Sequence, residues 1–254
     1  MVTLRSLAIP AHAKLNLWLK VVGRRPDGYH EVDTLMQAIS LHDLLIVERA
    51  SSTDLEGGVR GADDLVLQAQ RALESAVGRP LPARFRLVKR IPVGAGLGGG
   101  SSDAAAALRA LRRLYELDCD LTPVAVAVGA DVKFFLSGGA MVAQGRGDQL
   151  LPARPSGEWY ALAWPGFEVS TARVYAAWDR VGGEGDNHLA RAALTIEPRL
   201  AGFVAMLGDG WRMTGSGSTF FRAFPERAEA ERAIASLRGC WATVARPIGA
   251  WGAI

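Results

Sequence analysis

Hydrophobic and polar side chains alternate along several short stretches of this chain, and a period of two residues predicts β-strands. The clearest case is the segment 84–91, where Phe85, Leu87 and Ile91 alternate with basic residues. Such a strand is half exposed, and half-exposed strands are more often antiparallel than parallel. We expect further strands over residues 13–22, 30–39, 44–48, 138–144, 159–164, 220–224 and 241–248.

A spacing of three to four residues between apolar positions predicts helices elsewhere in the chain. Between Asp63 and Val77 this spacing places leucines and alanines on one side of a helix, which Gly78 and Pro80 end. Further helices are expected over 102–117, 122–129, 171–181 and 225–237, with Thr122 as the N-cap of the second and Pro123 at its first position. The segments 54–61 and 182–187 are expected to be loops.

Strands and helices interleave in both halves of the chain, and several strands alternate in polarity. This order indicates an α+β fold with mixed or antiparallel sheets. The composition changes at residues 151–157, a stretch that contains Pro152 and Pro155. We place a domain boundary there, so that residues 1–150 form one domain and residues 151–254 form a second.

Composition and charge narrow the class of protein. The 254 residues suffice for one large or two modest domains, and the net charge of +3 is too small to argue for nucleic acid, although it suits an anionic substrate. Cys119 and Cys240 are the only cysteines, which excludes a disulfide framework and a cysteine-rich metal site. No segment resembles a signal peptide or a membrane span, so we expect a cytoplasmic protein without nucleic-acid or membrane partners. The oligomeric state is not fixed by the sequence.

Residues 91–108 carry the strongest indication of function. Five glycines between positions 94 and 100 run into Ser101 and Ser102, and an alanine-rich helix former follows. Glycine permits positive φ and the close approach of an anion, and the first turn of a helix offers unpaired N–H groups. The segment therefore predicts a cradle for nucleotide phosphates. The alternative is a flexible turn that Ser102 or Asp103 caps.

Two better-known phosphate loops do not fit this segment. A Walker loop ends in Gly-Lys-Ser/Thr, whereas Gly100 is followed directly by Ser101. The dinucleotide-binding pattern is formally present within 94–99, but its loop follows a fully buried parallel strand, and the segment 84–91 is half exposed. A dehydrogenase is therefore a minor alternative. A second small-residue loop, 214–219, is either another amide nest near phosphate or a site of close packing.

Three further groups of residues are candidates for chemistry. Lys14 and Asn16 lie two positions apart and so share one face of a strand, either at a site or on a solvated sheet surface. Asp131 lies between a short helix and an apolar run, where it either caps a turn or accepts a proton from an alcohol. Tyr29 and His30 end a tight turn and either recognise a base or belong to a packed hairpin.

The order of five segments resembles the GHMP kinase superfamily, named for galactokinase, homoserine kinase, mevalonate kinase and phosphomevalonate kinase. The segments are 13–17, 23–30, 92–102, 129–132 and 214–217. Within the superfamily, AKLNL and RRPDGYH resemble the branch that uses ATP to phosphorylate the 2-hydroxyl of 4-diphosphocytidyl-2-C-methyl-D-erythritol in non-mevalonate isoprenoid synthesis. The resemblance implies an N-terminal domain with a left-handed β-α-β unit, a ferredoxin-like C-terminal domain, and ATP and substrate in the cleft between them.

The same resemblance implies roles for the reacting end of the site. It makes Asp131 the base for the 2-hydroxyl and Lys14 the charged partner of that base. Mg²⁺ is also implied, held either by phosphate and water or by a side chain such as Ser102 or Asp103. The ATP phosphates are implied to lie on Pro92, Val93, Gly94, Ala95, Gly96, Leu97, Gly98, Gly99, Gly100, Ser101 and Ser102.

The resemblance also implies how a small cytidyl substrate is bound. Tyr29 and Tyr175 would sandwich the cytosine ring, and His30 would read its edge. Asn16 and Thr171 would help to place the substrate.

Two alternatives to this function stay open at the level of sequence. A homoserine- or mevalonate-type kinase would share the ATP loop alone, and Tyr29 with His30 discriminates against it because those enzymes hold no cytosine. A nucleotide-binding relative without catalysis is the second alternative. In that relative Lys133, which stands where proline is usual, would loosen Asp131 or place a second charge near it.

Overall fold

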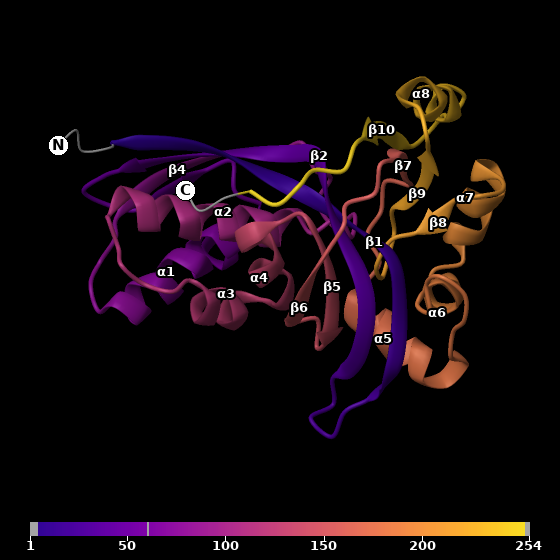
Figure 1. The fold of residues 1–254 in the computed structure, drawn as a ribbon, viewed down its shortest axis with the longest axis horizontal. Helices are drawn as coiled ribbons and strands as arrows, with labels where there is room; N and C mark the ends of the chain where they lie inside the picture. The colour runs from indigo at the N-terminus through magenta and orange to yellow at the C-terminus, as the bar shows by residue number, and fades with distance from the viewer. Residues whose placement is uncertain (1–4, 60, 252–254) are drawn as a thin grey trace.

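The computed structural model describes residues 5–59 and 61–251, which form two β-sheets with helices packed on them (Figure 1). The first sheet contains β1 (Ser6–Arg24), β2 (His30–Arg49), β3 (Asp54–Glu56), β4 (Ala83–Val88), β5 (Ala140–Gly145) and β6 (Gln149–Ala153). β1 pairs with β2 along its whole length, while β4 and β5 share the other edge of β2. Among the strand pairs of this sheet in the described part of the chain, only β3–β4 is parallel, so the sheet is mixed.

Four α-helices cover one face of the first sheet (Figure 1): α1 (Leu65–Val77), α2 (Gly99–Leu114), α3 (Thr122–Val128) and α4 (Ala130–Ser137), with the 3₁₀ turn η1 (Gly61–Asp63) before α1. α2 is the central helix, because it packs against β1, α1 and α4. Its alanines at 104–107 and 110 are almost completely buried, and their small side chains let the helix lie close to the sheet.

Helix ends follow local chemistry. The Asp64 side chain accepts a hydrogen bond from the Val66 amide (3.0 Å) and caps α1, and Gly78 closes that helix in the left-handed conformation with φ 68°. The helix ends where the sequence predicts. α5 (Thr171–Val181), whose bounds match the predicted helix, begins after Ser170, which accepts from the Arg173 amide (3.4 Å).

The second sheet has the strand order β10-β7-β9-β8, and all of its pairs are antiparallel. Its strands are β7 (Trp159–Trp164), β8 (Arg212–Met213), β9 (Phe220–Phe224) and β10 (Trp241–Ala245), and its helices are α5, α6 (Ala190–Ile196), α7 (Arg199–Leu207) and α8 (Arg227–Ala235). A helical stretch therefore separates β7 from β8, and α8 separates β9 from β10. This β-α-β-β-α-β order confirms the ferredoxin-like arrangement of the C-terminal half.

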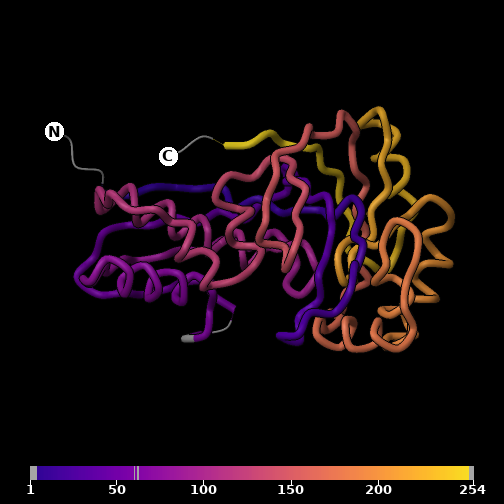
Figure 2. Tube along the Cα trace, turned by 60° about the horizontal axis from the view of Figure 1, so that its bottom comes forward, coloured from indigo at the N-terminus to yellow at the C-terminus, as the bar shows by residue number. Residues whose placement is uncertain are grey.

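The two sheets meet in a shared core. Leu15 of β1 packs with Tyr160 of β7 and Phe221 of β9, and all three are fully buried. After β10 the chain returns to the N-terminal half, where Ile39 bridges to Pro247 (Figure 2). The expected boundary at 150/151 falls inside β6, and the division at that point stays a prediction. The handedness of the expected β-α-β unit also stays a prediction.

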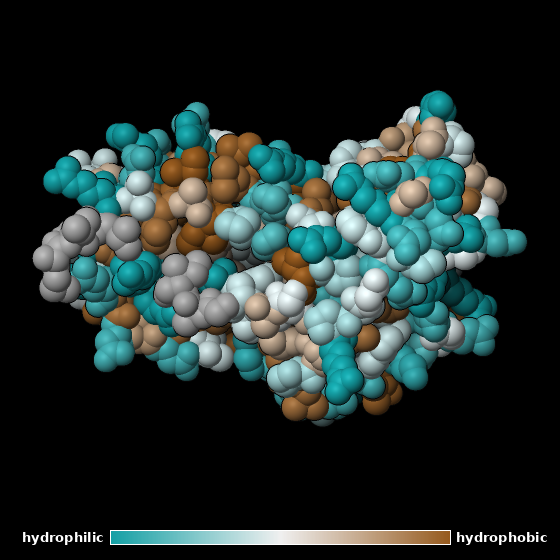
Figure 3. All heavy atoms as spheres, turned by 45° about the horizontal axis from the view of Figure 1, so that its top comes forward, coloured by the Kyte–Doolittle hydropathy of each residue, from teal (hydrophilic) through white to brown (hydrophobic). Residues whose placement is uncertain are grey.

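On the molecular surface, hydrophobic side chains form patches among polar ones on the face that Figure 3 shows. Within residues 5–59 and 61–251, no helix has the length and apolar character needed to cross a membrane.

The strand predicted over 30–39 and the strand predicted over 44–48 are one element, β2. The expected break coincides with Asp43, a charged residue that normally interrupts a strand. Here Asp43 is fully buried and accepts hydrogen bonds from the Arg90 and Ile91 amides (2.5 and 2.8 Å). These bonds satisfy its carboxylate, so the strand continues through it.

Other predicted elements also need correction. The apolar run after Gly129 is α4, an additional helix. β3 lies in the expected loop 54–61, and β6 overlaps the expected linker. Thr122 is the first helical residue of α3, because Leu121 occupies the N-cap position without a side-chain hydrogen bond.

Candidate active site

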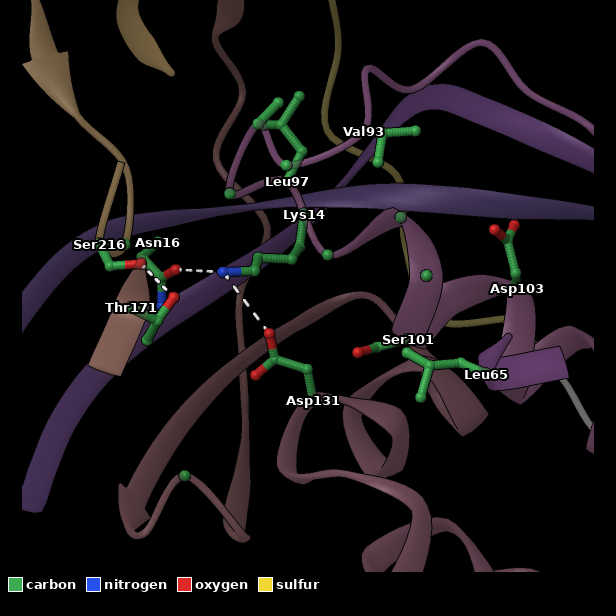
Figure 4. Close-up of a pocket in the computed structure, with 18 of the residues that line it drawn as sticks. Lys14, Asn16, Leu65, Val93, Leu97, Ser101, Asp103, Asp131, Thr171 and Ser216 are labelled. Atoms are coloured by element: carbon green, nitrogen blue, oxygen red, sulfur yellow. Dashed lines mark hydrogen bonds and ion pairs between the residues drawn. The ribbon is translucent and has the colours of Figure 1, made fainter. Parts of the chain in front are cut away.

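A cavity of about 490 Å³ opens between the two halves of the fold (Figure 4). Its walls come from β1 and β2, the glycine loop (residues 92–98), the first turn of α2, the start of α1, α4, α5 and the loop at 215–216. Most of the residues that the sequence singles out meet here. Those on the wall are Lys14, Asn16, all of 92–101, Asp131, Thr171 and Tyr175, whereas Tyr29, His30 and Ser102 are not part of it.

The glycine loop has the backbone conformation that an anion cradle needs. Gly94, Gly96 and Gly98 have φ of +74°, +79° and +73°. Gly98 is the N-cap of α2 and makes no side-chain cap, so no side chain covers the first N–H groups of the helix. Neither Ser102 nor Asp103 caps a turn, since both are buried within α2. The capped-turn alternative is therefore wrong.

The second small-residue loop, residues 214–219, packs against the glycine loop. The Thr219 hydroxyl donates to the Ala95 carbonyl (2.7 Å), and a Cβ at Gly96 would overlap the Gly217 carbonyl. Close packing between the two loops is thereby confirmed. Gly215 and Ser216 of the same loop also line the cavity.

Lys14 and Asn16 are not on a solvated sheet surface, because each is only 6% exposed. The Lys14 ammonium donates to Asn16 Oδ1 (2.5 Å), and the Asn16 amide donates to the Thr34 hydroxyl (2.9 Å). Thr34 in turn donates to the Trp18 carbonyl (2.6 Å). This chain of hydrogen bonds fixes the direction of the ammonium before any ligand arrives. No sequence signal singled out Thr34, which lies on the neighbouring strand.

Asp131 lies in the first turn of α4, and Gly129 rather than Asp131 is the N-cap of that helix. Its Oδ2 atom is 3.7 Å from the Lys14 ammonium, and its side chain is 38% exposed (Figure 4). The carboxylate therefore faces the cavity beside a buried cation. A carboxylate in this position can accept a proton from a hydroxyl bound in the cavity.

Two residues expected to contact the substrate lie on α5. The Thr171 hydroxyl is 2.8 Å from the Ser216 hydroxyl, so it joins α5 to the second loop. Burial, with a contribution from the charge of Asp131, raises the pKa of Tyr175 to about 12. The Tyr175 phenol therefore stays protonated and can donate a hydrogen bond in the cavity.

The aromatic side chains that are expected to bind the cytosine ring do not all lie together. His30 stacks on Tyr175 with ring centroids 4.8 Å apart, and its Nε2 atom is 2.7 Å from Asp179. Tyr29 is 57% exposed, and the Arg146 guanidinium lies 4.3 Å from its ring centroid. Arg146 lines the cavity, so Tyr29 lies behind a wall residue that the sequence did not indicate.

A charged cluster that the sequence did not predict adjoins the glycine loop. Lys89 donates to Asp43 (2.5 Å) and to Asp103 (2.7 Å), and Lys89 and Asp103 line the cavity. Burial raises the pKa of Asp103 to about 7. The Lys89 ammonium partly offsets this rise, and the charge of Asp43 adds to it. Burial alone would lower the pKa of Lys89, but the two carboxylates raise it. Three separate elements supply this cluster, which is why spacing along the chain gave no signal.

Lys133 does not form an ion pair with Asp131 within residues 5–59 and 61–251. Its ammonium donates to the Asp148 carbonyl (2.7 Å) and so ties α4 to the turn between β5 and β6. Arg146 belongs to the same turn, where its amide donates to Asp148 Oδ1 (3.1 Å). Lys133 therefore supports the wall that carries Arg146.

The donor set of the cavity can be compared with the needs of a divalent metal. The described part of the chain has no cluster of three or more His, Cys, Asp or Glu that could hold a metal ion by itself. Asp131 and Ser101 both line the cavity, and Figure 4 shows their side chains in its lower half. A carboxylate with a hydroxyl fits Mg²⁺, which usually takes one or two protein oxygens and completes its shell with phosphate and water.

Comparison with known proteins points to a single family of kinases. The family model described as "GHMP kinases N terminal domain" matches residues 64–140. A 4-diphosphocytidyl-2-C-methyl-D-erythritol kinase of Pseudomonas putida is 37% identical over 254 residues, covering 91% of this chain and 88% of the relative. The enzyme of the same name from Aromatoleum aromaticum is 38% identical over 255 residues, covering 91% and 89%.

Solved structures give the same result. The crystal structure of a 4-(cytidine 5'-diphospho)-2C-methyl-D-erythritol kinase matches with a TM-score of 0.82 and 37% identity, covering 94% of this chain and 99% of that one. A homoserine kinase from Cytophaga hutchinsonii matches with a TM-score of 0.70 at 17% identity, covering 98% and 96%. At that identity the second likeness shows the fold alone.

Proposed function

Since the chain belongs to the 4-diphosphocytidyl-2-C-methyl-D-erythritol kinases of the GHMP kinase superfamily, we propose that it transfers the γ-phosphoryl group of ATP to the 2-hydroxyl of that cytidyl alcohol. The observation that carries the proposal is the 3.7 Å pair of Lys14 and Asp131, in a cavity that the glycine loop also lines. A base beside a phosphate cradle is what phosphoryl transfer to an alcohol requires.

The proposed reaction begins with the substrate hydroxyl against Asp131. As the hydroxyl oxygen attacks the γ-phosphorus atom, its proton passes to the Asp131 carboxylate and the bond to the ADP oxygen breaks. Lys14 remains charged and stabilises both the carboxylate and the oxygen that loses its proton. Because hydrogen bonds through Asn16 and Thr34 already hold Lys14, little reorganisation is needed during the reaction.

The glycine loop and the first turn of α2 provide the proposed phosphate site. Gly94, Gly96 and Gly98 give the loop a left-handed backbone that other residues rarely adopt, and in such a loop main-chain N–H groups can converge on phosphate oxygens. When bound, Mg²⁺ supplies positive charge to the transferring group. Ser101, whose hydroxyl is on the cavity wall, is the residue that would hold it, with phosphate oxygens and water as the other ligands. Ser102 is excluded from this role because it is buried in α2.

The cytidyl end of the substrate is proposed to lie toward α5. Tyr175 offers a ring face on the cavity wall, and Asp179 fixes the imidazole of His30 behind it. Thr171 and Asn16 supply polar groups between this end and Asp131. Tyr29 would complete the sandwich only after Arg146 leaves its ring, so that arginine is expected to move when substrate binds.

The proposal is tested by an assay that couples ADP release to a colour change. The purified protein receives Mg²⁺ and ATP with the cytidyl alcohol, with homoserine or with mevalonate. Turnover is expected with the cytidyl alcohol alone. Asp131→Asn is expected to lower kcat by about 10²- to 10⁴-fold, the usual contribution of a general base, with ATP affinity nearly unchanged.

Asp118→Asn is the matched control, because Asp118 is exposed and lies outside the cavity. It should leave kcat and KM unchanged. If the wild-type protein releases no ADP with the cytidyl alcohol but does so with homoserine or mevalonate, the substrate assignment is wrong. If no alcohol is phosphorylated although ATP binds, the chain is a nucleotide-binding relative without catalysis.

A further inference from the structure

A second cavity, of about 190 Å³, shares no wall residue with the candidate active site. One wall is the segment 8–12 of β1, with Ala8, Ile9 and Pro10 as its apolar part and His12 at its end. Arg109 of α2 and Trp251 complete the lining. Its chemistry is unlike that of an ordinary packing void, because a guanidinium is part of the wall.

Arg109 is a largely buried cation with no counter-ion among the described residues. The residue is 7% exposed, and within residues 5–59 and 61–251 it has neither a hydrogen-bond acceptor nor a carboxylate partner. The Arg109 guanidinium carbon lies 5.4 Å from the centroid of the Trp251 ring. A cation–π contact supplies no acceptor for the N–H groups of the guanidinium, which are free to bind an anion in the cavity.

The other charges around Arg109 do not compensate it. Burial and the neighbouring charge of Arg112 lower the pKa of Arg109 to about 10, so the guanidinium stays charged at neutral pH. Burial, with the charges of His42 and Arg109, lowers the pKa of His12 to about 4, so that imidazole is neutral. No carboxylate is present among the described lining residues. Among the described residues, the cavity therefore has a positive wall and no anion.

The aromatic side of the cavity is firmly anchored. The Trp251 indole donates to the Leu136 carbonyl (3.1 Å), and a Cβ at Gly138, where φ is +62°, would overlap the indole ring. The His12 ring stacks on Trp251 with centroids 5.4 Å apart, and its Nδ1 atom is 3.1 Å from the Ile39 carbonyl. Both rings are held by bonds to other elements, so the cavity cannot simply collapse onto Arg109.

We propose that this cavity is a binding site for a small oxyanion, a carboxylate or a phosphate group, held by the Arg109 guanidinium. The planar fork of an arginine matches two oxygens of such a group and forms charge-assisted hydrogen bonds with them. Trp251 and His12 flank the fork, and Ala8, Ile9 and Pro10 offer apolar surface to the remainder of an organic anion. The site lies on α2, the helix whose first turn forms part of the proposed phosphate cradle.

The test uses NMR on the full-length protein saturated with ADP, which keeps added anions away from the glycine loop. The indole N–H signal of Trp251 is assigned with Trp251→Phe, and inorganic phosphate, acetate or propionate is then titrated. We expect a saturable shift of this signal with phosphate or with the carboxylates, and the responding probe identifies the anion. Binding should also raise Tm by roughly 3 °C when the anion is well above its Kd.

Two variants separate the role of the guanidinium from general effects. Arg109→Met keeps the length of the side chain, and both the indole shift and the Tm rise should disappear. Arg109→Lys keeps the charge without the fork, and the affinity should fall about tenfold. Because Met removes an unpaired buried charge, the anion-free Arg109→Met protein should be at least as stable as wild type.

Two results would overturn the proposal. One is an indole signal that moves only linearly with salt up to tens of millimolar, which would mean that water alone solvates Arg109. The other is the same saturable shift in Arg109→Met as in wild type. If Arg109→Met does not fold, Arg109→Lys decides the question. An unchanged anion affinity in that variant would show that the planar guanidinium does not bind the anion.

Discussion

The Lys14 ammonium lies 3.7 Å from the Asp131 carboxylate, but the two partners differ in their access to solvent. The Lys14 side chain is 8% exposed and the Asp131 side chain is 38% exposed. A buried cation thus faces a carboxylate that a substrate can still reach. This asymmetry suits a base that must accept a proton while its partner keeps its own.

Replacing Lys14 with methionine should therefore damage turnover more than binding. We expect Lys14→Met to lower kcat by roughly 10²-fold or more while the Kd for ATP changes little, because the lost charge acts on the oxygen that is deprotonated. Steady-state kinetics with both substrates measure this split. In the proposed mechanism Lys14 and Asp131 act as a unit, so the double variant with Asp131→Asn should be little worse than the poorer single variant.

Lys20→Met is the matched control, because Lys20 lies on the same strand, is exposed and is placed over the Trp18 ring. It should keep wild-type kcat. Strictly additive losses in the Lys14→Met, Asp131→Asn double variant would show that the two side chains do not work on the same step.

The recognition of the base can be tested at Tyr29. Tyr29→Ala should raise KM for the cytidyl alcohol by about 5- to 150-fold and leave KM for ATP nearly unchanged, because stacking on a base contributes about 1–3 kcal/mol. Tyr29→Phe, which keeps the ring, should behave like wild type. An equal rise in both KM values, or a normal KM in Tyr29→Ala, would argue against stacking at this position.

The sequence predicts well those features that depend on neighbouring residues. The alternation at 84–91 indicates a half-exposed antiparallel strand, and β4 pairs antiparallel with β2 and alternates in burial. Lys14 and Asn16 share a face because a strand has a period of two. That both side chains are buried is known only from the structure. The positive φ values at 94, 96 and 98 follow from the glycines that occupy those positions.

Features that depend on partners far apart in the chain were not predictable. Lys89 finds Asp43 and Asp103 only when β2, the segment after β4 and α2 are assembled. The continuation of β2 through Asp43 depends on the same assembly, because amides at 90 and 91 satisfy that carboxylate. The spacing of residues along the chain does not indicate such contacts. The hydrophobic pattern therefore predicts a break between the strands at Asp43, where the fold has a buried ion pair.

The Asp103 carboxyl should make stability depend on pH. Burial, reinforced by Asp43, raises its pKa from 3.8 to about 7 in the folded protein. The folded state therefore holds the proton more tightly than the unfolded state, and this contribution to stability is lost as pH rises from about 4 to about 7. Asp103→Asn removes this titration. As the pH rises from 5 to 8, the unfolding free energy of the variant should therefore increase by about 1 kcal/mol or more relative to that of the wild type.

Urea unfolding at several pH values measures this difference. Asp118→Asn again provides the control, because Asp118 is exposed and should not alter the slope. Stability curves of wild type and Asp103→Asn that run parallel from pH 5 to pH 8 would mean that Asp103 stays ionised beside Lys89.

The hydrogen bond from Lys133 to the Asp148 carbonyl should support the wall that carries Arg146. Lys133→Met keeps the length of the side chain but loses the donor, so we expect about 1 kcal/mol less stability and a rise of a few-fold in KM for the cytidyl alcohol. The kcat value should change little, because Lys133 forms no ion pair with Asp131 in the described part of the chain. A large fall in kcat with a normal KM would instead mean that Lys133 acts on Asp131.

The position of Gly96 against the Gly217 carbonyl should be the point of the proposed phosphate site that tolerates substitution least. Gly96 has φ of +79°, and a Cβ there would overlap that carbonyl, so Gly96→Ala combines backbone strain with a steric clash. We expect a loss of about 2 kcal/mol or more in unfolding free energy and at least a tenfold weaker ATP affinity, measured by urea unfolding and calorimetry.

Gly100→Ala provides the comparison within the same segment. Gly100 lies in the first turn of α2 without a positive φ, and its added Cβ would meet only the Leu65 side chain at 3.2 Å. A flexible leucine can move by that amount, and alanine is the better helix former, so stability should stay the same or rise slightly. If Gly96→Ala were tolerated as well as Gly100→Ala, the tight bracing of the two loops would not be needed for the cradle.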